Sequence, residues 1–151
     1  MAINIRIKGA SAERDIADKL NAIVKKVLIE CGQHDMLDNH NYFAQRNQQQ
    51  TAVGGNDLIN TYGFGIEVKR QEALSINTWW EQCTKAAMKN NEVPVLLFRQ
   101  TRQKWRCITT LYIGLPKNAE GRVQFGQCRA EITIDDFLKT YEHHVRAKLK
   151  G

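Results

Sequence analysis

Two short segments of the chain carry acidic and basic side chains at a spacing that suits chemistry. The first is Gly54-Gly55-Asn56-Asp57-Leu58, and the second is Ile66-Glu67-Val68-Lys69. Side chains alternate along a strand, so Glu67 and Lys69 are expected to share one face while the residues between them point into the other layer. A hairpin turn between the two segments would bring Asp57 next to Glu67. We therefore expect two carboxylates and a lysine to converge at one spot.

Such a group of side chains suits a divalent cation and a phosphate. Mg²⁺ takes hard oxygen ligands in an octahedron, which two carboxylates, the backbone carbonyl of Val68 and waters could supply. The ion neutralises a phosphate and lowers the pKa of a bound water. A neighbouring lysine can then orient that water or stabilise the charge that develops on phosphorus. The alternative is that Glu67 and Lys69 form a solvated ion pair of little energetic value.

The pattern resembles the PD-(D/E)xK nuclease superfamily. Asp57 stands in the first acidic position of that motif, and Glu67 and Lys69 supply its Glu-x-Lys, which occurs only once in the sequence. Asn56 replaces the usual proline, a position that shapes the backbone and supplies no ligand. The resemblance implies a restriction-endonuclease-like core, catalysis by Asp57, Glu67 and Lys69, and a Mg²⁺ cofactor for which Mn²⁺ substitutes.

The segment Lys8-Gly9-Ala10-Ser11-Ala12-Glu13-Arg14 is similar to the Lys-Gly-x-x-x-Glu-Arg opening of archaeal-type Holliday-junction resolvases. In that family the helix-borne glutamate joins the metal site. The resemblance therefore assigns Glu13 to catalysis and to metal binding, together with Asp57, Glu67 and the Val68 carbonyl. The alternative is that Glu13 only stabilises a helix N-terminus through the helix dipole. The resemblance covers residues 7–100, and a viral resolvase would fit it equally well.

The charge of the chain favours a polyanionic partner. The 22 Lys and Arg residues against 16 Asp and Glu give a net charge of +6. No acidic residue lies between Glu92 and Glu120, a segment that holds five positive side chains. Basic residues in this segment and near the expected site are candidates for binding DNA phosphates, although a solvated turn would also explain 99–106. These candidates are Lys8, Arg14, Arg70, Arg99, Arg102, Lys104 and Arg106.

Hydrophobic spacing predicts the elements that would position these residues. Apolar residues at helical spacing indicate a helix over 11–30, with Ser11 as its cap and Gly32 at its end. Further helices are expected over 75–90 and from Thr133 onward. Strands are expected at 41–46, 57–60, 64–69, 93–99, 105–113 and 122–128.

This order of elements predicts a single α/β domain over residues 1–151, with a central mixed β-sheet flanked by helices. The segment Val93–Arg99 begins with a continuous apolar run, which is typical of a strand at the centre of a sheet covered on both faces. Trp79 and Trp80 lie in the apolar stripe of the second helix. That position favours packing in the core over stacking on bases.

Composition excludes several classes of protein. Apolar residues make up 42% and charged residues 25%, as in an ordinary globular domain. No apolar run approaches the roughly 20 residues that span a bilayer, so we expect no membrane partner. The first eight residues alternate apolar and polar side chains and lack the apolar core of a secretory signal. We therefore expect a cytoplasmic protein, in the host cytoplasm if the chain is viral, with its four cysteines reduced.

Together these patterns predict a Mg²⁺-dependent, structure-selective DNA endonuclease, with a Holliday-junction resolvase of DNA recombination as the leading interpretation. Paired nicks across a two-fold symmetric junction suit a homodimer, and the helix over 75–90 or the C-terminal helix could form its interface. Two alternatives stay open. One is another PD-(D/E)xK nuclease that acts on flaps, ends or a recognition sequence, and the other is a non-catalytic, basic DNA-binding subunit.

Overall fold

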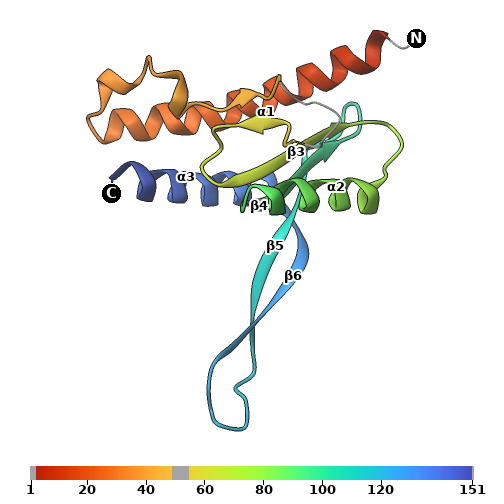
Figure 1. Cartoon of the computed structure of the whole chain (residues 1–151), viewed down its shortest axis with the longest axis vertical. Helices are drawn as coiled ribbons and strands as arrows, with labels where there is room; N and C mark the ends of the chain where they lie inside the picture. Colours follow the sequence, from red (N-terminus) through yellow and green to blue (C-terminus); the bar gives the residue numbers. More distant parts are fainter. Residues whose placement is uncertain (1–2, 49–54, 151) are drawn as a thin grey trace.

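The computed structural model describes residues 3–48 and 55–150, with side chains from residue 6 onward (Figure 1). Gly54, the first glycine of the predicted active-site segment, lies outside these residues. The helices are α1 (Ile3–Glu30), α2 (Ile76–Lys89) and α3 (Ile134–Lys150), with short 3₁₀ turns at His34–Met36 and His40–Tyr42. The strands are β1 (Gln45–Arg46), β2 (Leu58–Ile59), β3 (Phe64–Arg70), β4 (Val93–Arg99), β5 (Arg106–Leu115) and β6 (Gln124–Thr133).

The main sheet of the described residues has the strand order β3-β4-β5-β6. β3 and β4 are parallel, and α2 makes the crossover between them. The other neighbouring strands are antiparallel. The mixed α/β sheet predicted from the sequence is therefore confirmed. Because β3 is at the edge of this sheet, its outer side is open to a preceding segment of the chain.

Helices cover both faces of the sheet (Figure 1). α1 and α3 pack against one another and against one face, where Tyr141 of α3 is completely buried. α2 covers the other face, and Trp79 packs on Phe98 with 5.9 Å between the ring centroids. α2 approaches β3 closely at Gly65, where an added Cβ would lie 2.8 Å from the Cβ of Ala87. Glycine at this position lets α2 lie against the strand that carries the candidate site.

β4 shows how the sequence sets these layers. Its residues alternate between the two faces, so Val95 and Leu97 pack with α1 and α3 while Leu96 and Phe98 pack with α2. All four are at most 1% exposed. The bounds and the central position predicted for this strand are confirmed.

α1 begins earlier than the sequence predicted, at Ile3 rather than Ser11. Gly9 and Ser11 therefore lie inside the helix, and Ser11 is not its cap. A helix interior tolerates such residues at a cost of up to about 1 kcal/mol each, so neither stops a helix that is anchored further along by its buried face. The predicted C-terminal end is confirmed: α1 ends at Glu30, and Gly32 adopts a φ of +70° that favours glycine.

The hairpin predicted around Asp57 does not form as a strand ladder. Within the described residues, β2 pairs with β1 instead of β3. The chain turns sharply between β2 and β3 through positive φ angles at Asn60 (59°), Tyr62 (55°) and Gly63 (90°). The two segments still touch, because the backbone N–H of Asp57 donates to the carbonyl of Ile66 at 3.0 Å. One backbone contact therefore replaces the predicted ladder.

Three other predicted strands change in length. The strand expected over 41–46 is reduced to Gln45–Arg46, because the chain before it forms a 3₁₀ turn. β5 and β6 are longer than expected and pair from Arg106↔Thr133 to Leu115↔Gln124. Figure 1 shows the distal half of this hairpin extending well beyond the helices. Among the described helices, none combines the length and apolar character needed to cross a membrane.

Candidate active site

Asp57 lies directly before β2 and is held against the open edge of β3. Its carboxylate Oδ2 accepts a hydrogen bond from the backbone N–H of Val68 at 2.6 Å. Together with the bond from its own N–H to Ile66, this contact fixes both the backbone and the side chain of Asp57 on the edge strand. Asp57 is only 8% exposed, so its carboxylate is held at the site with little contact to water.

Glu67 and Lys69 lie on the same strand, one on each side of Val68. The Lys69 Nζ is 3.1 Å from the Glu67 Oε1. Glu67 is also 8% exposed, so this pair is not the solvated ion pair that the sequence left as an alternative. Ile66 and Val68 point into the core formed with α1 and α3, as alternation predicts. The structure therefore brings Asp57, Glu67 and Lys69 together at one edge of the sheet.

The two carboxylates are electrostatically strained. Burial, together with the nearby negative charge of Glu67, raises the pKa of Asp57 to about 7, while the hydrogen bond from Val68 opposes the shift. Burial also raises the pKa of Glu67, against the opposing effect of Lys69. Two acids that resist ionisation side by side are typical of a functional site and are unfavourable in a purely structural one.

Glu13 lies on α1 beside this pair. Its negative charge contributes to the raised pKa of both Asp57 and Glu67, which places it in their neighbourhood. Its carboxylate Oε2, however, is 2.6 Å from the Nε of Arg46 on β1. Arg46 was not among the residues predicted from the sequence. It reaches the site because β1 pairs with β2, which follows Asp57 directly.

Asn56, which takes the place of proline in the motif, connects the site to the turn between α2 and β4. It is buried, and its Nδ2 donates to the Glu92 carboxylate at 2.6 Å. Its backbone carbonyl accepts from the Nδ2 of Asn47 at 3.0 Å. These bonds hold the backbone just before Asp57. Asn56 therefore provides by hydrogen bonding the rigidity that proline would provide covalently.

The oxygen donors at this site fit a divalent metal ion. Mg²⁺ prefers carboxylate and carbonyl oxygens, and a cation between Asp57 and Glu67 would offset the burial and the neighbouring negative charges that raise their pKa values. Over residues 3–48 and 55–150, however, no three or more His, Cys, Asp or Glu side chains are gathered closely enough to hold a metal ion. Glu13 is paired with Arg46 instead of being drawn in toward the two carboxylates. Glu13, Asp57 and Glu67 therefore lie near one another, but their carboxylates are not close enough together to coordinate one ion.

The predicted DNA-binding residues differ in how they are held. Arg70 and Arg99 are direct neighbours at the ends of the parallel strands β3 and β4. The Nε of each is buried and has no hydrogen-bond partner among the described residues. The Arg99 guanidinium also stacks on Trp105, at 4.9 Å from the ring centroid. Lys8 lies near Arg70, because both charges contribute to the lowered pKa of Glu72, whose main cause is a hydrogen bond from Thr101.

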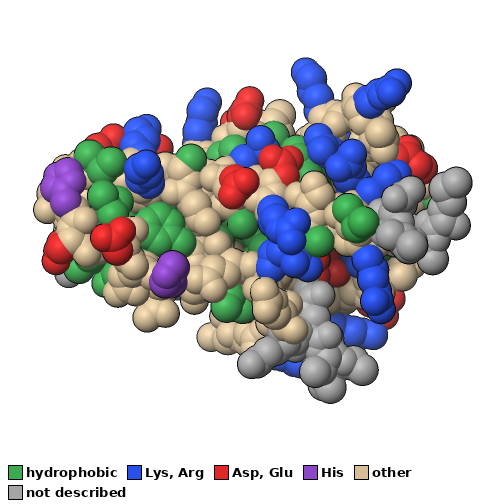
Figure 2. Space-filling model, turned by 90° about the horizontal axis from the view of Figure 1, so that it is seen from above, with side chains coloured by type: hydrophobic (Ala, Val, Ile, Leu, Met, Phe, Trp, Pro, Cys, Tyr) green, Lys and Arg blue, Asp and Glu red, His purple; other side chains and the backbone are tan. Residues whose placement is uncertain are grey.

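Arg106 is the exception within the basic segment. It makes two bonds to the Glu131 carboxylate, at 2.6 and 2.9 Å, and lies over the ring of Phe98. Arg102 and Lys104 are exposed in the turn before β5. Arg14 is exposed on α1 and lines a surface hollow together with Arg46. Figure 2 shows that Lys and Arg side chains are more numerous beside the N-terminal half of α1 than beside its C-terminal end.

The chain is similar to known proteins in two comparisons. The family described as “phage putative PDDEXK endonuclease” matches residues 4–148, nearly the whole sequence. Among solved structures, the chain is similar to Hjc, a Holliday junction resolvase from the archaeal hyperthermophile Archaeoglobus fulgidus. The identity is 21%, the match covers 66% of this chain and 70% of that chain, and the TM-score is 0.36. No curated protein matches the sequence.

Proposed function

The chain belongs to the family of phage PD-(D/E)xK endonucleases, and we propose that it is a Mg²⁺-dependent DNA endonuclease that resolves four-way junctions. The observation that carries this proposal is the pair of buried carboxylates of Asp57 and Glu67 at the edge of β3, with Lys69 in contact with Glu67. Two buried carboxylates with raised pKa values lower the stability of the folded chain when they are ionised. Such a cost is typical of side chains that serve a ligand or a reaction. Residues 1–151 would form one nuclease domain around this site.

Asp57, Glu67 and the backbone carbonyl of Val68 would hold the Mg²⁺, and Mn²⁺ would substitute for it. When bound, the ion supplies positive charge to the phosphate that is cleaved. Glu13 would complete the ligand set from α1. The ion pair with Arg46 holds Glu13 beside the site, so Arg46 is a positioning residue in this proposal.

Lys69 would position the attacking water and stabilise the negative charge that develops on phosphorus. Its Nζ is already held by Glu67, so little rearrangement is needed to present the ammonium group to a phosphate. Attack of water on phosphorus releases the 3′ oxygen and leaves a 5′-phosphate on the other side of the nick. The residues of this chain would thus bind the phosphate, orient the water and neutralise the developing charge, and the water oxygen would form the new bond to phosphorus.

Arg70 and Arg99 would bind the DNA backbone next to the cleaved phosphate. Arg70 follows Lys69 in β3, Arg99 is its register partner on β4, and the Nε of each has no hydrogen-bond partner among the described residues. Lys8, Arg14, Arg102 and Lys104 would extend this contact as exposed phosphate ligands. Arg106 is occupied by Glu131, so its role would be to hold the base of the β5–β6 hairpin instead of the DNA.

A four-way junction is the proposed substrate because Lys8, Gly9, Glu13 and Arg14 stand in the order found in archaeal-type resolvases. Resolution needs matched cuts in two strands, which a homodimer with one site per chain delivers most simply. Phage DNA is processed in the host cytoplasm, where the four free thiols of this chain would stay reduced. Cleavage of flaps, ends or a recognition sequence is the second candidate within the same family.

The test is a cleavage panel. The protein is incubated with Mg²⁺ or with EDTA and with linear duplex, flap, single-stranded and four-way DNA built from the same sequences, beside the Asp57→Asn variant. We expect paired nicks in the four-way DNA that need Mg²⁺ and Asp57. Equal cleavage of another substrate would favour the second candidate. Tight binding with no cleavage of any substrate would favour a DNA-binding subunit.

A further inference from the structure

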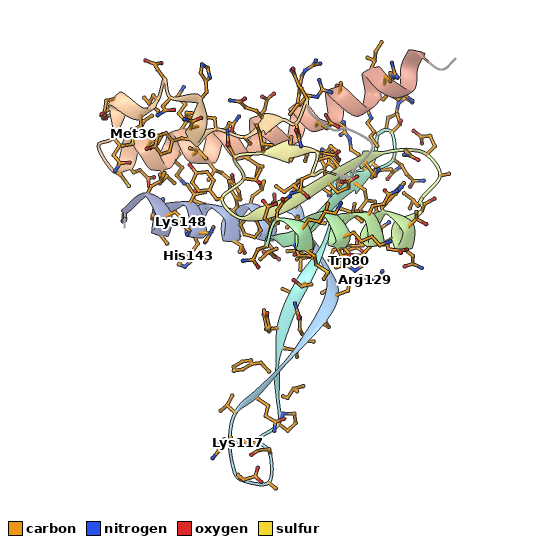
Figure 3. The ribbon with its side chains drawn as sticks, in the orientation of Figure 1. Met36, Trp80, Lys117, Arg129, His143 and Lys148 are labelled. Atoms are coloured by element: carbon orange, nitrogen blue, oxygen red, sulfur yellow. The ribbon has the colours of Figure 1, made fainter. Side chains whose placement is uncertain are left out.

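The distal part of the β5–β6 hairpin is a separate feature that the proposed active site does not use. We call residues 110–130 the arm. Figures 1 and 3 show it extending away from the helices, with Lys117 at its far end. The arm leaves the body where the Arg129 Nη1 donates to the Asn77 Oδ1 of α2 at 3.0 Å. Beyond that point its large apolar side chains are exposed, among them Ile113 at 52% and Phe125 at 67%.

The register of the hairpin sorts these side chains onto two faces. Residues paired across an antiparallel ladder point to the same side, and successive residues alternate. One side, which we call the uncharged face, carries residues that are apolar or small and, at its far end, one amide. Its members are Leu111, Ile113, Leu115, Gln124, Gly126, Cys128 and Ala130, all of them described by the structure. The opposite side carries Thr110, Tyr112, Gly114, Phe125, Gln127 and Arg129.

An exposed two-stranded β-ribbon with an apolar face is expected to pack against another surface. An isolated hairpin is marginally stable in water, and an apolar face must pack on another surface to hold it. The structure shows no such packing for Leu111, Ile113 or Leu115, which are 38%, 52% and 44% exposed. Leu115 only bends over Gly126 of its own arm. The uncharged face is therefore built for a partner.

We propose that the uncharged face binds the arm of a second copy of this chain, in a two-fold symmetric dimer. In such an interface the same patch is used by both copies, so a charge of one sign with no opposite charge in the patch would be buried unpaired. The chain has a net charge of +6, yet this face carries none of it. DNA is a poorer occupant, because phosphates and base edges need cations or hydrogen-bond donors, and the arm places Arg129 on the other face.

The two helices that the sequence offered as dimer surfaces are used elsewhere. Trp79 of α2 is buried under the sheet, and Phe137, Tyr141 and Val145 of α3 are in the core. The arm is what projects far enough to reach another molecule. This inference rests on the proposed function, because a dimer has two active sites and can cut two strands of a four-way junction. The face consists of seven residues, against roughly 20–30 on each side of a standard interface, so the dimer is expected to dissociate on dilution.

The test compares two neighbouring substitutions on opposite faces. Sedimentation of the full chain without DNA, over ~1–200 µM, measures dimerisation of the wild type, Ile113→Glu and Tyr112→Glu. We expect the wild type and Tyr112→Glu to reach dimer mass with rising concentration. Ile113→Glu should dimerise at least ~100-fold more weakly, because symmetry would bury two unpaired charges. Unchanged near-UV circular dichroism, which reports on the buried Trp79 and Trp105, shows that the variants are folded.

The other outcomes overturn the proposal. One is a wild type that stays monomeric at every concentration, and another is equal dimerisation of the two variants. The third is a monomeric wild type whose DNA affinity falls with Ile113→Glu, which would mean that DNA binds to the uncharged face. Cleavage is measured in parallel, so that the nuclease proposal is tested separately. A monomeric Ile113→Glu variant that still makes single nicks supports both proposals. Absence of cleavage by all three proteins would count against the nuclease while leaving the dimer result intact.

Discussion

The carboxylate of Asp57 accepts a hydrogen bond from the backbone of Val68, the residue between Glu67 and Lys69. The first acid of the motif is thus positioned by the strand that carries the other two residues. This contact explains why the site forms although the predicted ladder between β2 and β3 does not. This side-chain bond, together with the backbone bond from Asp57 to Ile66, holds Asp57 on the edge strand, as the hairpin was expected to do.

Removing the charge of Asp57 should stabilise the metal-free protein at high pH. Its pKa is raised to about 7 in the folded state, against about 4 in an unfolded chain, so ionisation opposes folding increasingly as pH rises through this interval. Asp57→Asn keeps the acceptor for Val68 but removes this cost, which amounts to as much as about 4 kcal/mol. We expect Asp57→Asn to exceed the wild type in free energy of unfolding at pH 8 and to match it near pH 4.

Urea denaturation in EDTA at the two pH values measures this difference. Asp38→Asn, which removes one carboxylate at an exposed aspartate in the turn after α1, is the matched control. Added Mg²⁺ should stabilise the wild type more than Asp57→Asn, because an ion between the two carboxylates relieves their repulsion. Equal stability of wild type and Asp57→Asn at pH 8 would show that the carboxylate is not strained.

Asp57→Asn, Glu67→Gln and Lys69→Met should each reduce cleavage by at least ~1,000-fold while leaving DNA affinity within ~3-fold. The reason is that these groups act on the transition state, whereas phosphate contacts elsewhere supply most of the affinity. Single-turnover cleavage and a binding titration in Ca²⁺ separate the two effects. Glu81→Gln, at an exposed glutamate of α2, serves as the control. A variant that cuts at nearly the wild-type rate would remove that residue from the mechanism.

Glu13 and Arg46 should act as one unit. Glu13→Gln removes the proposed ligand, and Arg46→Gln removes the group that holds it, so each should slow cleavage and raise the Mg²⁺ concentration needed for half the maximal rate. Because their side chains are in contact at 2.6 Å, the double variant should be little worse than the worse single variant. Additive losses would mean that Arg46 contributes independently, for example by binding DNA.

Arg70→Ala and Arg99→Ala should each flatten the salt dependence of DNA binding by about one unit of log–log slope. Both guanidinium groups have an unused Nε donor near the site. Arg106→Ala is the matched comparison, because Arg106 is held by Glu131 on both sides of its fork. Its loss should lower the stability of the hairpin base and leave the slope unchanged. A larger change in slope for Arg106→Ala would place the DNA on the opposite side of the basic segment.

Local patterns in the sequence predicted most of what positions the site. Alternation along 64–69 placed Glu67 and Lys69 on one face, and the apolar run at 93–99 identified the central strand. Contacts between distant segments were not predictable in the same way. Arg46 meets Glu13 only because a two-residue strand pairs with β2, and Asn56 meets Glu92 across 36 positions of the chain. Neither pairing leaves a periodic pattern in the sequence.

The length of the strands that form the arm was underestimated for a related reason. Strand prediction relies on alternation between a buried and an exposed face, and at Tyr112, Ile113 and Phe125 apolar residues lie on both sides of the ribbon. The start of α1 was misplaced because Gly9 and Ser11 are common at helix ends, yet here they lie inside a helix that is held by its buried face further along. In both cases the tertiary environment determines the element more than local preference does.

The most direct test of the central claim uses a supercoiled plasmid that extrudes a cruciform, which is a four-way junction in closed circular DNA. Two matched cuts across the junction convert the plasmid to linear DNA with a hairpin at each end. Each hairpin holds one nick, which ligase can seal because the nick carries a 5′-phosphate. We predict linear product from the wild type in Mg²⁺, none in EDTA and none with Asp57→Asn. Linearisation that persists with Asp57→Asn, or that proceeds in EDTA, would contradict the account.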